Sequence, residues 1–300
     1  MTRNAESDRI TFAVPFYSDV PYLERTLRSI LAQRDDAWDA VVVDDGDALG
    51  VAETVAALGA GRIRYQKNQQ NLGLGRNFNR CLDVAETSLV TVLHADDELL
   101  PGYTGAMRAA AARHVEAAAF YCRTTIIGPD SQRLFSLADA VKDRCNPARH
   151  RDHVVVGEQG VRALLVANFI PAPTLCFRRS RLGSRRFPVE YRFVLDWALT
   201  MQLLFEGESI VGLAEPLYLY RRHAHNMTEQ LTKTHERFRE ESLFYHRVRD
   251  AARGHGWERC AAVAQHKTMV KLHIVYRAAK SLARGEIDDV RRGVALLRDL

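Results

Sequence analysis

Residues 93–102 read LHADDELLPG and place two adjacent carboxylates, Asp96 and Asp97, directly after an apolar run. That run, LVTVL at residues 89–93, is short and rich in β-branched side chains, which predicts a buried strand of a parallel sheet covered on both faces. Ligands of open α/β sheets bind just beyond the carboxyl ends of the strands, so we expect both acids at a ligand site. Oxygen ligands suit Mg²⁺ or Mn²⁺, which often bridge to substrate phosphates. The alternative is that the acids only form a turn, where Asp is common.

A second acidic pair ends another predicted strand. Residues 41–46 read VVVDDG, an apolar run that ends in Asp44, Asp45 and a glycine. Ahead of it, ITFAVPFY at residues 10–17 reads as a further strand, and a helix with one apolar face is expected over residues 20–31. Strand and helix patterns continue to alternate as far as Asp96, which predicts a nucleotide-binding half-fold whose strands end in polar residues at one edge.

Taken in order, the motifs resemble those of the family 2 glycosyltransferases, inverting enzymes that use sugar nucleotides and have the GT-A fold. Each motif is weak by itself, but the ordered set is specific and covers roughly residues 8–228. The motifs are the Pro-aromatic strand end at 15–17, Asp-Asp-Gly at 44–46, NLGLGRNFNRCLDVA at 71–85, Asp-Asp at 96–97, PAPTLCFRRS at 171–180, the acid Asp196, and YRRHAHNMT at 220–228.

The resemblance implies an α/β GT-A fold, with a Rossmann-like nucleotide-binding half, a mixed sheet and a helical C-terminal extension. We expect a glycosyltransferase domain at residues 1–228, divided into a nucleotide-binding half (8–100) and an acceptor half (101–228), followed by the helical extension at 229–300. Residues 138–153 have no apolar period and carry a basic cluster, and we expect a loop there that closes over the site when donor binds. A solvated loop with no such role is the alternative.

The resemblance also implies roles in the donor site. Asp45 would hydrogen-bond the nucleotide base, and Pro15 and Tyr17, at the end of the first strand, are assigned to the same donor site. Asp96 would lie near the ribose. Asp97 would bind the divalent cation, Mn²⁺ or Mg²⁺, which neutralises charge that develops on the departing diphosphate.

Three basic positions complete the expected donor site or depart from the family pattern. His94 stands where the familiar Asp-x-Asp has its first acid, and no role is assigned to it. Arg76, at the start of a predicted helix, matches the family's third motif and would face phosphate; a solvated surface residue is the alternative. His223 matches a segment that in the family closes over the diphosphate.

Asp196 is the candidate general base, because it immediately precedes the apolar face of a predicted helix whose dipole would keep its carboxylate ionised. An ordinary N-cap is the alternative, and the two roles are compatible. The expected reaction is a metal-dependent single in-line displacement that moves a sugar from a nucleoside-diphosphate sugar to an acceptor hydroxyl or amine, with inversion. A nucleotidyltransferase would want a glycine-rich loop after the first strand, and PFYSDVPY has no glycine. A non-catalytic sugar-nucleotide-binding scaffold would bind donor without turnover.

Composition limits the partners. The chain has 300 residues, 47% hydrophobic content and a formal net charge of +5, which fits an anionic donor only weakly. No basic stripe with interleaved aromatic residues appears, so we expect no nucleic acid. No apolar run approaches the roughly 20 residues that span a bilayer, and the first residues lack a signal-peptide core, so we expect a cytoplasmic chain with its five cysteines reduced.

The acceptor is not encoded in a readable motif. A soluble metabolite, a lipid-linked intermediate reached by peripheral contact with a membrane, and a protein all remain open. The C-terminal helices offer a surface for a homo-oligomer.

Overall fold

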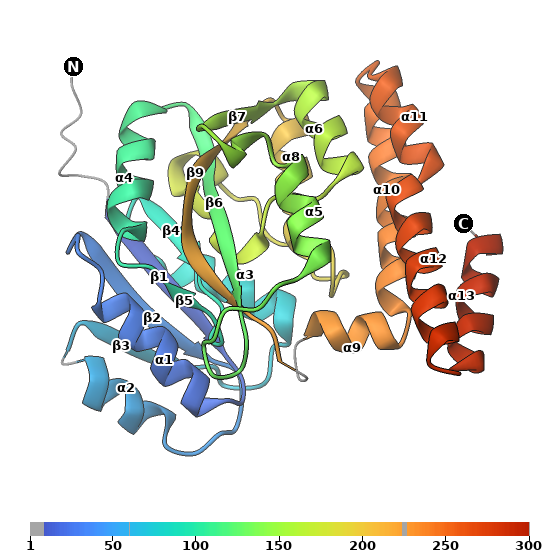
Figure 1. Ribbon diagram of the computed structural model, residues 1–300. Coiled ribbons are helices and arrows are strands. Elements are labelled where there is room, and N and C mark those ends of the chain that lie inside the picture. Colours follow the sequence, from blue (N-terminus) through green and yellow to red (C-terminus); the bar gives the residue numbers. More distant parts are fainter. Residues whose placement is uncertain (1–8, 60, 224–226, 300) are drawn as a thin grey trace.

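The computed structural model describes residues 9–59, 61–223 and 227–299, and within them one mixed sheet is flanked by helices on both faces (Figure 1). The strand order is β3-β2-β1-β4-β8-β6-β9-β5, with β7 beside β9. The predicted α/β fold with a mixed sheet and a helical C-terminal region is confirmed.

The N-terminal half is parallel, as the alternating pattern predicts. Its strands are β1 (Ile10–Phe16), β2 (Trp38–Asp44), β3 (Ile63–Lys67) and β4 (Leu89–Val92), and its helices are α1 (Val20–Leu31), α2 (Val51–Gly59) and α3 (Leu74–Val84). Phe12 and Val14 pack on the side of α1 and α2, whereas Ala13 packs with residues of α3. Both faces of β1 are therefore buried, which is why its sequence is continuously apolar.

The C-terminal half of the sheet adds antiparallel pairs. β8 (Cys176–Arg178) runs antiparallel to β4 and to β6 (Ala117–Ile127), and β5 (Glu98–Leu99) and β7 (His153–Val156) run antiparallel to β9 (Ser209–Arg221). The helices of this half are α4 (Tyr103–Arg113), α5 (Leu137–Cys145), α6 (Gly157–Val166), α7 (Arg179–Leu182) and α8 (Leu195–Phe205), with 3₁₀ turns at Pro147–Arg149 and Ala172–Thr174. The long strand β9 thus pairs with β7 along its first residues and with β5 near its end, where the backbone N–H of Arg221 donates to Asp97.

The C-terminal extension consists of α9 (Met227–Lys233), α10 (Glu236–Gly254), α11 (Glu258–His266), α12 (Thr268–Ala283) and α13 (Ile287–Asp299). The Trp197 ring of α8 lies 4.8 Å from the Phe244 ring and 5.6 Å from the Tyr245 ring of α10, measured between centroids. The extension therefore shares a hydrophobic core with the rest of the fold, and the expected boundary at residue 228 falls inside α9. None of the helices in the described part of the chain is both long and apolar enough to cross a membrane.

Residues 138–153 are not the irregular loop that the sequence suggested, because α5 occupies residues 138–145, a 3₁₀ turn follows at Pro147–Arg149, and β7 begins at His153. The helix is specified locally: Ser136 Oγ accepts a hydrogen bond from the backbone N–H of Asp139, and Lys142 and Arg144 lie in the last turn, where cations favour the helix dipole. A bidentate ion pair of Arg123 with Asp143 (2.7 and 2.9 Å) ties the helix to β6. The helix was not predicted because its apolar period is weak and its cap and charged side chains stabilise it instead. Movement of this segment when donor binds stays a prediction.

Candidate functional site

Five of the eight predicted site residues line one hollow of about 2220 Å³ between the carboxyl edge of the sheet and the C-terminal helices. Pro15 and Tyr17 contribute from the end of β1, Asp96 follows β4, Asp196 lies in α8, and His223 follows β9. Residues more than 200 positions apart in the chain therefore share one cavity. The expected position of the site beyond the strand ends is what the sheet topology produces.

Asp96 and His223 form the polar centre of this wall. His223 Nε2 lies 2.9 Å from Asp96 Oδ2, and the Tyr22 ring packs 4.9 Å from the imidazole. Burial raises the pKa of Asp96, but the His223 hydrogen bond and the nearby His94 more than offset it, so the pKa falls below its usual value. Asp96 is thus an ionised carboxylate that faces the hollow.

Asp97 has a different environment from its neighbour. Its side chain is fully buried, Oδ1 accepts the backbone N–H of Arg221 at 2.7 Å, and Oδ2 accepts the Tyr218 hydroxyl at 2.9 Å. Burial and the charge of Asp96 raise the pKa of Asp97 well above its usual value. Direct metal binding by Asp97 stays a prediction, because the structure places Asp96, and not Asp97, on the wall of the hollow.

The side chains near Asp96 fit a divalent cation. His94, Asp96 and Asp97 each offer a ligand atom, and these atoms lie within 4.8 Å of one another. Burial lowers the pKa of His94, which leaves its imidazole neutral with a lone pair to donate. The carboxylate oxygens of Asp96 suit Mn²⁺ or Mg²⁺, and Asp96, His94 and His223 lie on the side of the hollow. His94 therefore joins the candidate ligands, although no role was assigned to it from the sequence.

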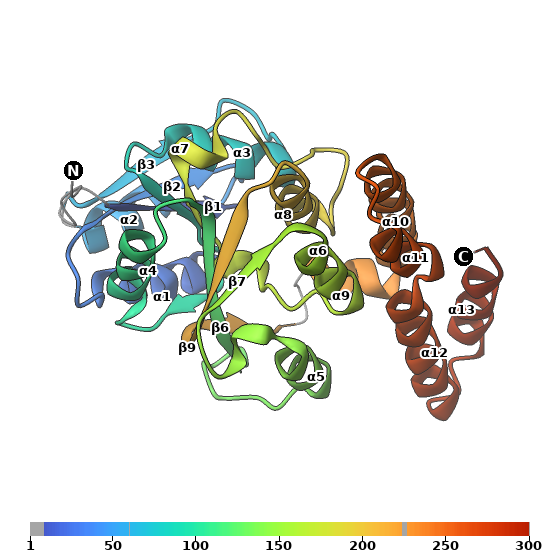
Figure 2. The same cartoon turned by 90° about the horizontal axis from the view of Figure 1, so that it is seen from above.

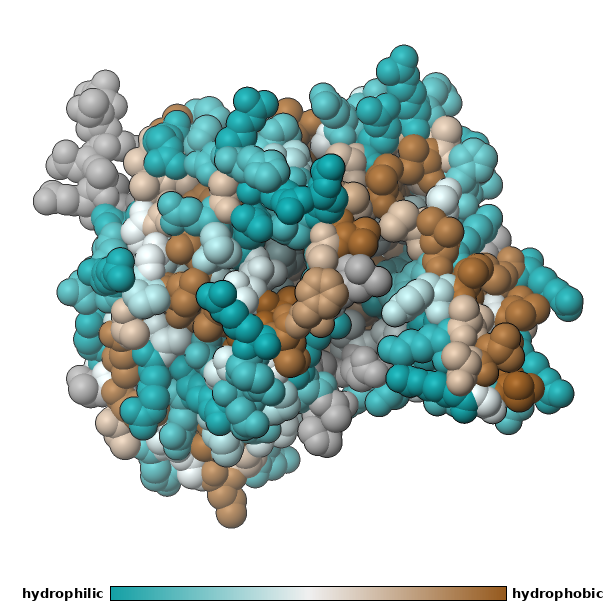
Figure 3. Space-filling model, in the orientation of Figure 1, coloured by the Kyte–Doolittle hydropathy of each residue, from teal (hydrophilic) through white to brown (hydrophobic). Residues whose placement is uncertain are grey.

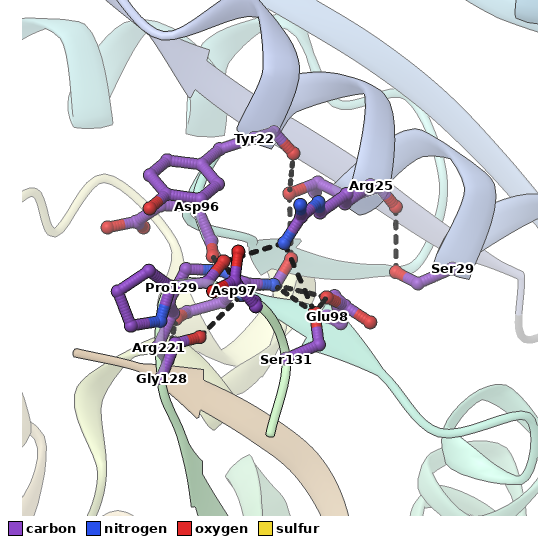
Figure 4. Close-up of polar contacts among 12 residues, drawn as sticks. Tyr22, Arg25, Ser29, Asp96, Asp97, Glu98, Gly128, Pro129, Ser131 and Arg221 are labelled. Atoms are coloured by element: carbon purple, nitrogen blue, oxygen red, sulfur yellow. Dashed lines mark hydrogen bonds and ion pairs between the residues drawn. The ribbon is translucent and has the colours of Figure 1, made fainter. Parts of the chain in front are cut away.

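Arg221 is the residue that fixes this arrangement, and its burial could not be foreseen from the sequence (Figure 4). Its guanidinium donates to the backbone oxygens of Asp96 (2.7 Å), Gly128 (2.7 Å) and Pro129 (3.0 Å), and it forms an ion pair with Glu98. The same group lies 5.0 Å from the centroid of the Tyr22 ring. One buried cation thus joins the ends of β6 and β9, the acidic segment and α1.

Asp45 is buried and organises a loop. Oδ1 accepts hydrogen bonds from Asn68 Nδ2 (2.8 Å) and the backbone N–H of Leu72 (2.7 Å), and Oδ2 accepts the N–H of Gly73 (2.9 Å). The adjacent Gly46 is required sterically, because a Cβ there would lie 1.6 Å from the carbonyl oxygen of Tyr17. The carboxylate of Asp45 is mostly used by the loop at 68–73, so its expected contact with a nucleotide base stays a prediction.

Arg76 is not on the wall of the hollow. It lies exposed in the first turn of α3, and its expected phosphate contact stays a prediction. Residues 224–226 of the last motif lie outside the described residues.

Asp196 lies one residue inside the N-terminus of α8 and lines the hollow. Burial raises its pKa to about 6, although hydrogen bonds from the backbone N–H groups of Asp196 and Trp197 oppose the shift. It is not the N-cap that the sequence left open, because Val194 occupies that position. A carboxylate with a pKa near neutrality and a free path to a cavity can accept a proton at physiological pH.

Glu240 of α10 holds the segment that leads into α8, and sequence reasoning missed it. Its Oε1 accepts the backbone N–H groups of Phe193 (2.5 Å) and Val194 (2.7 Å), and its Oε2 accepts that of Arg192 (3.0 Å). Three backbone donors just ahead of α8 are thus satisfied by one side chain of the C-terminal extension. No local pattern could have indicated these contacts, because they join residues 46 to 48 positions apart in the chain.

Comparisons with known proteins agree with this geometry. Residues 11–151 match the family model described as glycosyl transferase family 2. An uncharacterized protein of Mycobacterium tuberculosis is 39% identical over 99 residues, which are 33% of this chain and 31% of that protein. The putative glycosyltransferase EpsH of Bacillus subtilis is 22% identical over 233 residues, or 76% of this chain and 65% of EpsH. The chain thus spans less than two thirds of the length of these curated relatives.

Solved structures share the fold at low sequence identity. TarS 1–349 of S. aureus, which has also been solved with UDP-GlcNAc, has a TM-score of 0.64 at 16% identity, over 86% of this chain and 71% of that chain. The mannosyltransferase PcManGT of Pyrobaculum calidifontis, solved with GDP-Man and Mn²⁺, has a TM-score of 0.59 at 14% identity, over 97% and 85% of the two chains. At these identities the likeness establishes a common fold.

Replacing Arg221 should destabilise the protein, because its guanidinium holds the segment of Asp96 and the turn at Gly128 and Pro129 together. Arg221→Met leaves Glu98 and three backbone carbonyl oxygens without their cation, so we expect a loss of about 3–5 kcal/mol in the free energy of unfolding, measured by urea denaturation. Arg222→Met is the matched control, since Arg222 is exposed and pairs with Asp139 at the surface, and it should cost about 1 kcal/mol or less. Equal stability of the two variants would show that the Arg221 network is not a structural requirement.

Proposed function

By residues 11–151 the chain belongs to the family 2 glycosyltransferases, and from that premise we propose that it is a metal-dependent inverting enzyme that uses a nucleoside-diphosphate sugar. The observation that carries the proposal is the convergence of the Asp96–His223 pair and Asp196 on one hollow. The Asp96–His223 pair provides a negatively charged binding site for a cation. Asp196 provides a carboxylate that can accept a proton. The acceptor is a small-molecule or lipid-linked compound with a hydroxyl or amine group.

The proposed donor follows from the cation site. Asp96, His94 and His223 would hold Mn²⁺ or Mg²⁺, and the bound ion would supply positive charge opposite the departing diphosphate. The comparisons support such a donor, because structures with the same fold contain UDP-GlcNAc in TarS and GDP-Man with Mn²⁺ in PcManGT. Pro15 and Tyr17 would border the nucleotide from the end of β1, and Tyr17 is 64% exposed and accessible to a ligand.

The proposed reaction is one in-line displacement. The acceptor oxygen or nitrogen forms a bond to the anomeric carbon as the bond from that carbon to the diphosphate oxygen breaks. The acceptor proton passes to a carboxylate oxygen of Asp196, and the diphosphate leaves with the bonding electrons. Attack from the face opposite the leaving group inverts the anomeric centre, and no covalent enzyme intermediate is needed.

A panel of nucleoside diphosphates tests the donor site. With Mn²⁺, a nucleotide at a hundred times its dissociation constant should stabilise the protein by about 2.7 kcal/mol, seen as a rise in melting temperature. Asp96→Asn should lose the part of this rise that depends on Mn²⁺. Asp47→Asn, a fully exposed acid after β2, should keep it. Stabilisation by nucleotide that is identical in EDTA and in Mn²⁺ would exclude the metal-dependent mechanism.

Asp196→Asn tests the base. We expect the rate of transfer to fall by roughly 10²–10⁴ with unchanged nucleotide affinity, because the amide cannot accept the proton. In the wild type, the rate should rise with pH through about 6 as the Asp196 carboxyl ionises. A wild-type rate retained by the variant, with the same pH profile, would show that another group accepts the proton.

Stability gives an independent check on Asp196. Its pKa is raised in the folded state, so the protonated carboxyl favours folding at low pH, and this contribution is lost as pH rises through about 6. Asp196→Asn cannot ionise, so its melting temperature relative to wild type should be higher at pH 8 than at pH 5. A variant that is destabilised at both pH values would indicate a structural role instead.

Glu240 is predicted to be a positioning residue for Asp196. Burial is the main cause of the raised pKa of Asp196, and the charge of Glu240 adds to it. Glu240→Gln should therefore lower the transfer rate roughly tenfold without changing KM for the donor, and should shift the acid limb of the pH profile to lower pH. Glu236→Gln, which removes only an exposed ion pair with Arg192, is the control and should change neither. An unchanged pH profile in Glu240→Gln would show that Glu240 has a structural role only.

A further inference from the structure

Helix α12 exposes an apolar stripe that nothing in the described structure covers. Its residues recur at helical spacing on one face and are 38–59% exposed: Met269, Leu272, Val275, Tyr276 and Leu282. The opposite face, with Val270 and Ile274, is buried against the other C-terminal helices. Single exposed apolar residues are ordinary, but a row of them along one helix face is the kind of patch that marks an interaction surface.

The stripe continues around the mouth of the hollow. Met269, Leu272 and Tyr276 line the hollow from α12, and the exposed side chains of Phe135 and Val141 line it from the segment that includes α5. In Figure 2, α5 and α12 both extend toward the lower edge of the view, so the two rims face the same side of the molecule. Figure 3 looks onto that side and shows apolar side chains over its middle and over the C-terminal helices, with a depression between them.

The charge of this surface distinguishes between occupants. Helix α12 contains three basic residues, Lys271, Arg277 and Lys280, and no Asp or Glu. Lys280 and the following Arg284 are exposed and line the hollow. In a two-fold dimer, each patch would meet its own copy and bring these cations together, which is unfavourable. Acidic residues follow at Glu286, Asp288 and Asp289, around the start of α13, and Asp289 pairs with Arg277, so Lys271 and Lys280 are the α12 cations that remain for a partner.

We propose that the α12 stripe and the Phe135 rim dock on an anionic lipid bilayer, with the hollow open toward the headgroups. A basic helix with an apolar face inserts that face at the headgroup boundary, and its cations attract anionic lipid. Phe135 is 84% exposed and adds a large apolar side chain at the opposite rim. The inference rests on the surface alone and does not require the proposed function. If both hold, acceptors at a membrane surface can enter the hollow directly.

Vesicle co-sedimentation of the full chain tests the proposal. The protein should sediment with vesicles of phosphatidylcholine mixed with phosphatidylglycerol, more weakly with phosphatidylcholine alone, and less as salt is raised. The double variant Leu272→Ser with Tyr276→Ser should bind the mixed vesicles at least roughly tenfold more weakly than the wild type, because it removes apolar area from the stripe. Leu49→Ser, at a 92% exposed position in the loop before α2, is the matched apolar control and should bind like wild type.

A charge pair gives a second arm that does not alter the apolar stripe. Lys280→Glu with Arg284→Glu should abolish the preference for phosphatidylglycerol, whereas Arg28→Glu, an exposed position on α1, should not. The proposal is overturned if the wild type does not sediment with the mixed vesicles, or if both double variants bind as it does. It is also overturned if size-exclusion chromatography shows a dimer that Leu272→Ser with Tyr276→Ser converts to a monomer, since a second copy would then be the occupant.

Discussion

The buried guanidinium of Arg221 is the interaction on which the site depends. It is fully enclosed, and it joins the backbone at Asp96 to the turn at Gly128 and Pro129, while its own backbone N–H holds the carboxylate of Asp97. A buried cation is costly unless several acceptors surround it, and here carbonyl oxygens, Ser131 and Glu98 do so. Strand β9 can therefore end in only one place relative to the acidic segment. His223, two residues later, is brought to Asp96 by this constraint.

Burial separates two acids that are adjacent in sequence. Asp96 faces the hollow beside two imidazoles, which favour its ionised form, whereas Asp97 lies in the interior, where desolvation and its neighbour's charge favour the protonated form. Repulsion between the two carboxylates is reduced, because only one of them is ionised by preference. Asp96 thus presents one negative charge to a cation in the hollow. The hydrogen bonds that Asp97 accepts from Tyr218 and Arg221 hold the acidic segment in place.

The C-terminal helices are part of the site, although they follow the last family motif. Glu240 of α10 accepts hydrogen bonds from the segment just before α8, and Trp197 of α8 packs against Phe244 and Tyr245 of α10. The raised pKa of Asp196 is a consequence of the burial that this packing produces. The same helices also form one wall of the hollow and carry its exposed apolar rim. The extension accordingly contributes to the burial of Asp196 inside the cavity, and it supplies exposed apolar side chains at the entrance.

The sequence by itself determined the elements whose signals are local. The apolar runs of β1, β2 and β4, the apolar face of α1 and the polar strand ends predicted the nucleotide-binding half and the edge at which ligands bind, because such patterns act over a few residues. It misread α5, whose helix depends on caps and charges more than on an apolar face. Only the tertiary structure decided that Asp96 rather than Asp97 faces the hollow, that Arg221 is buried, and that Glu240 binds the segment before the helix of Asp196. Burial and long-range hydrogen bonds arise when distant segments pack together, and no short pattern in the chain encodes them.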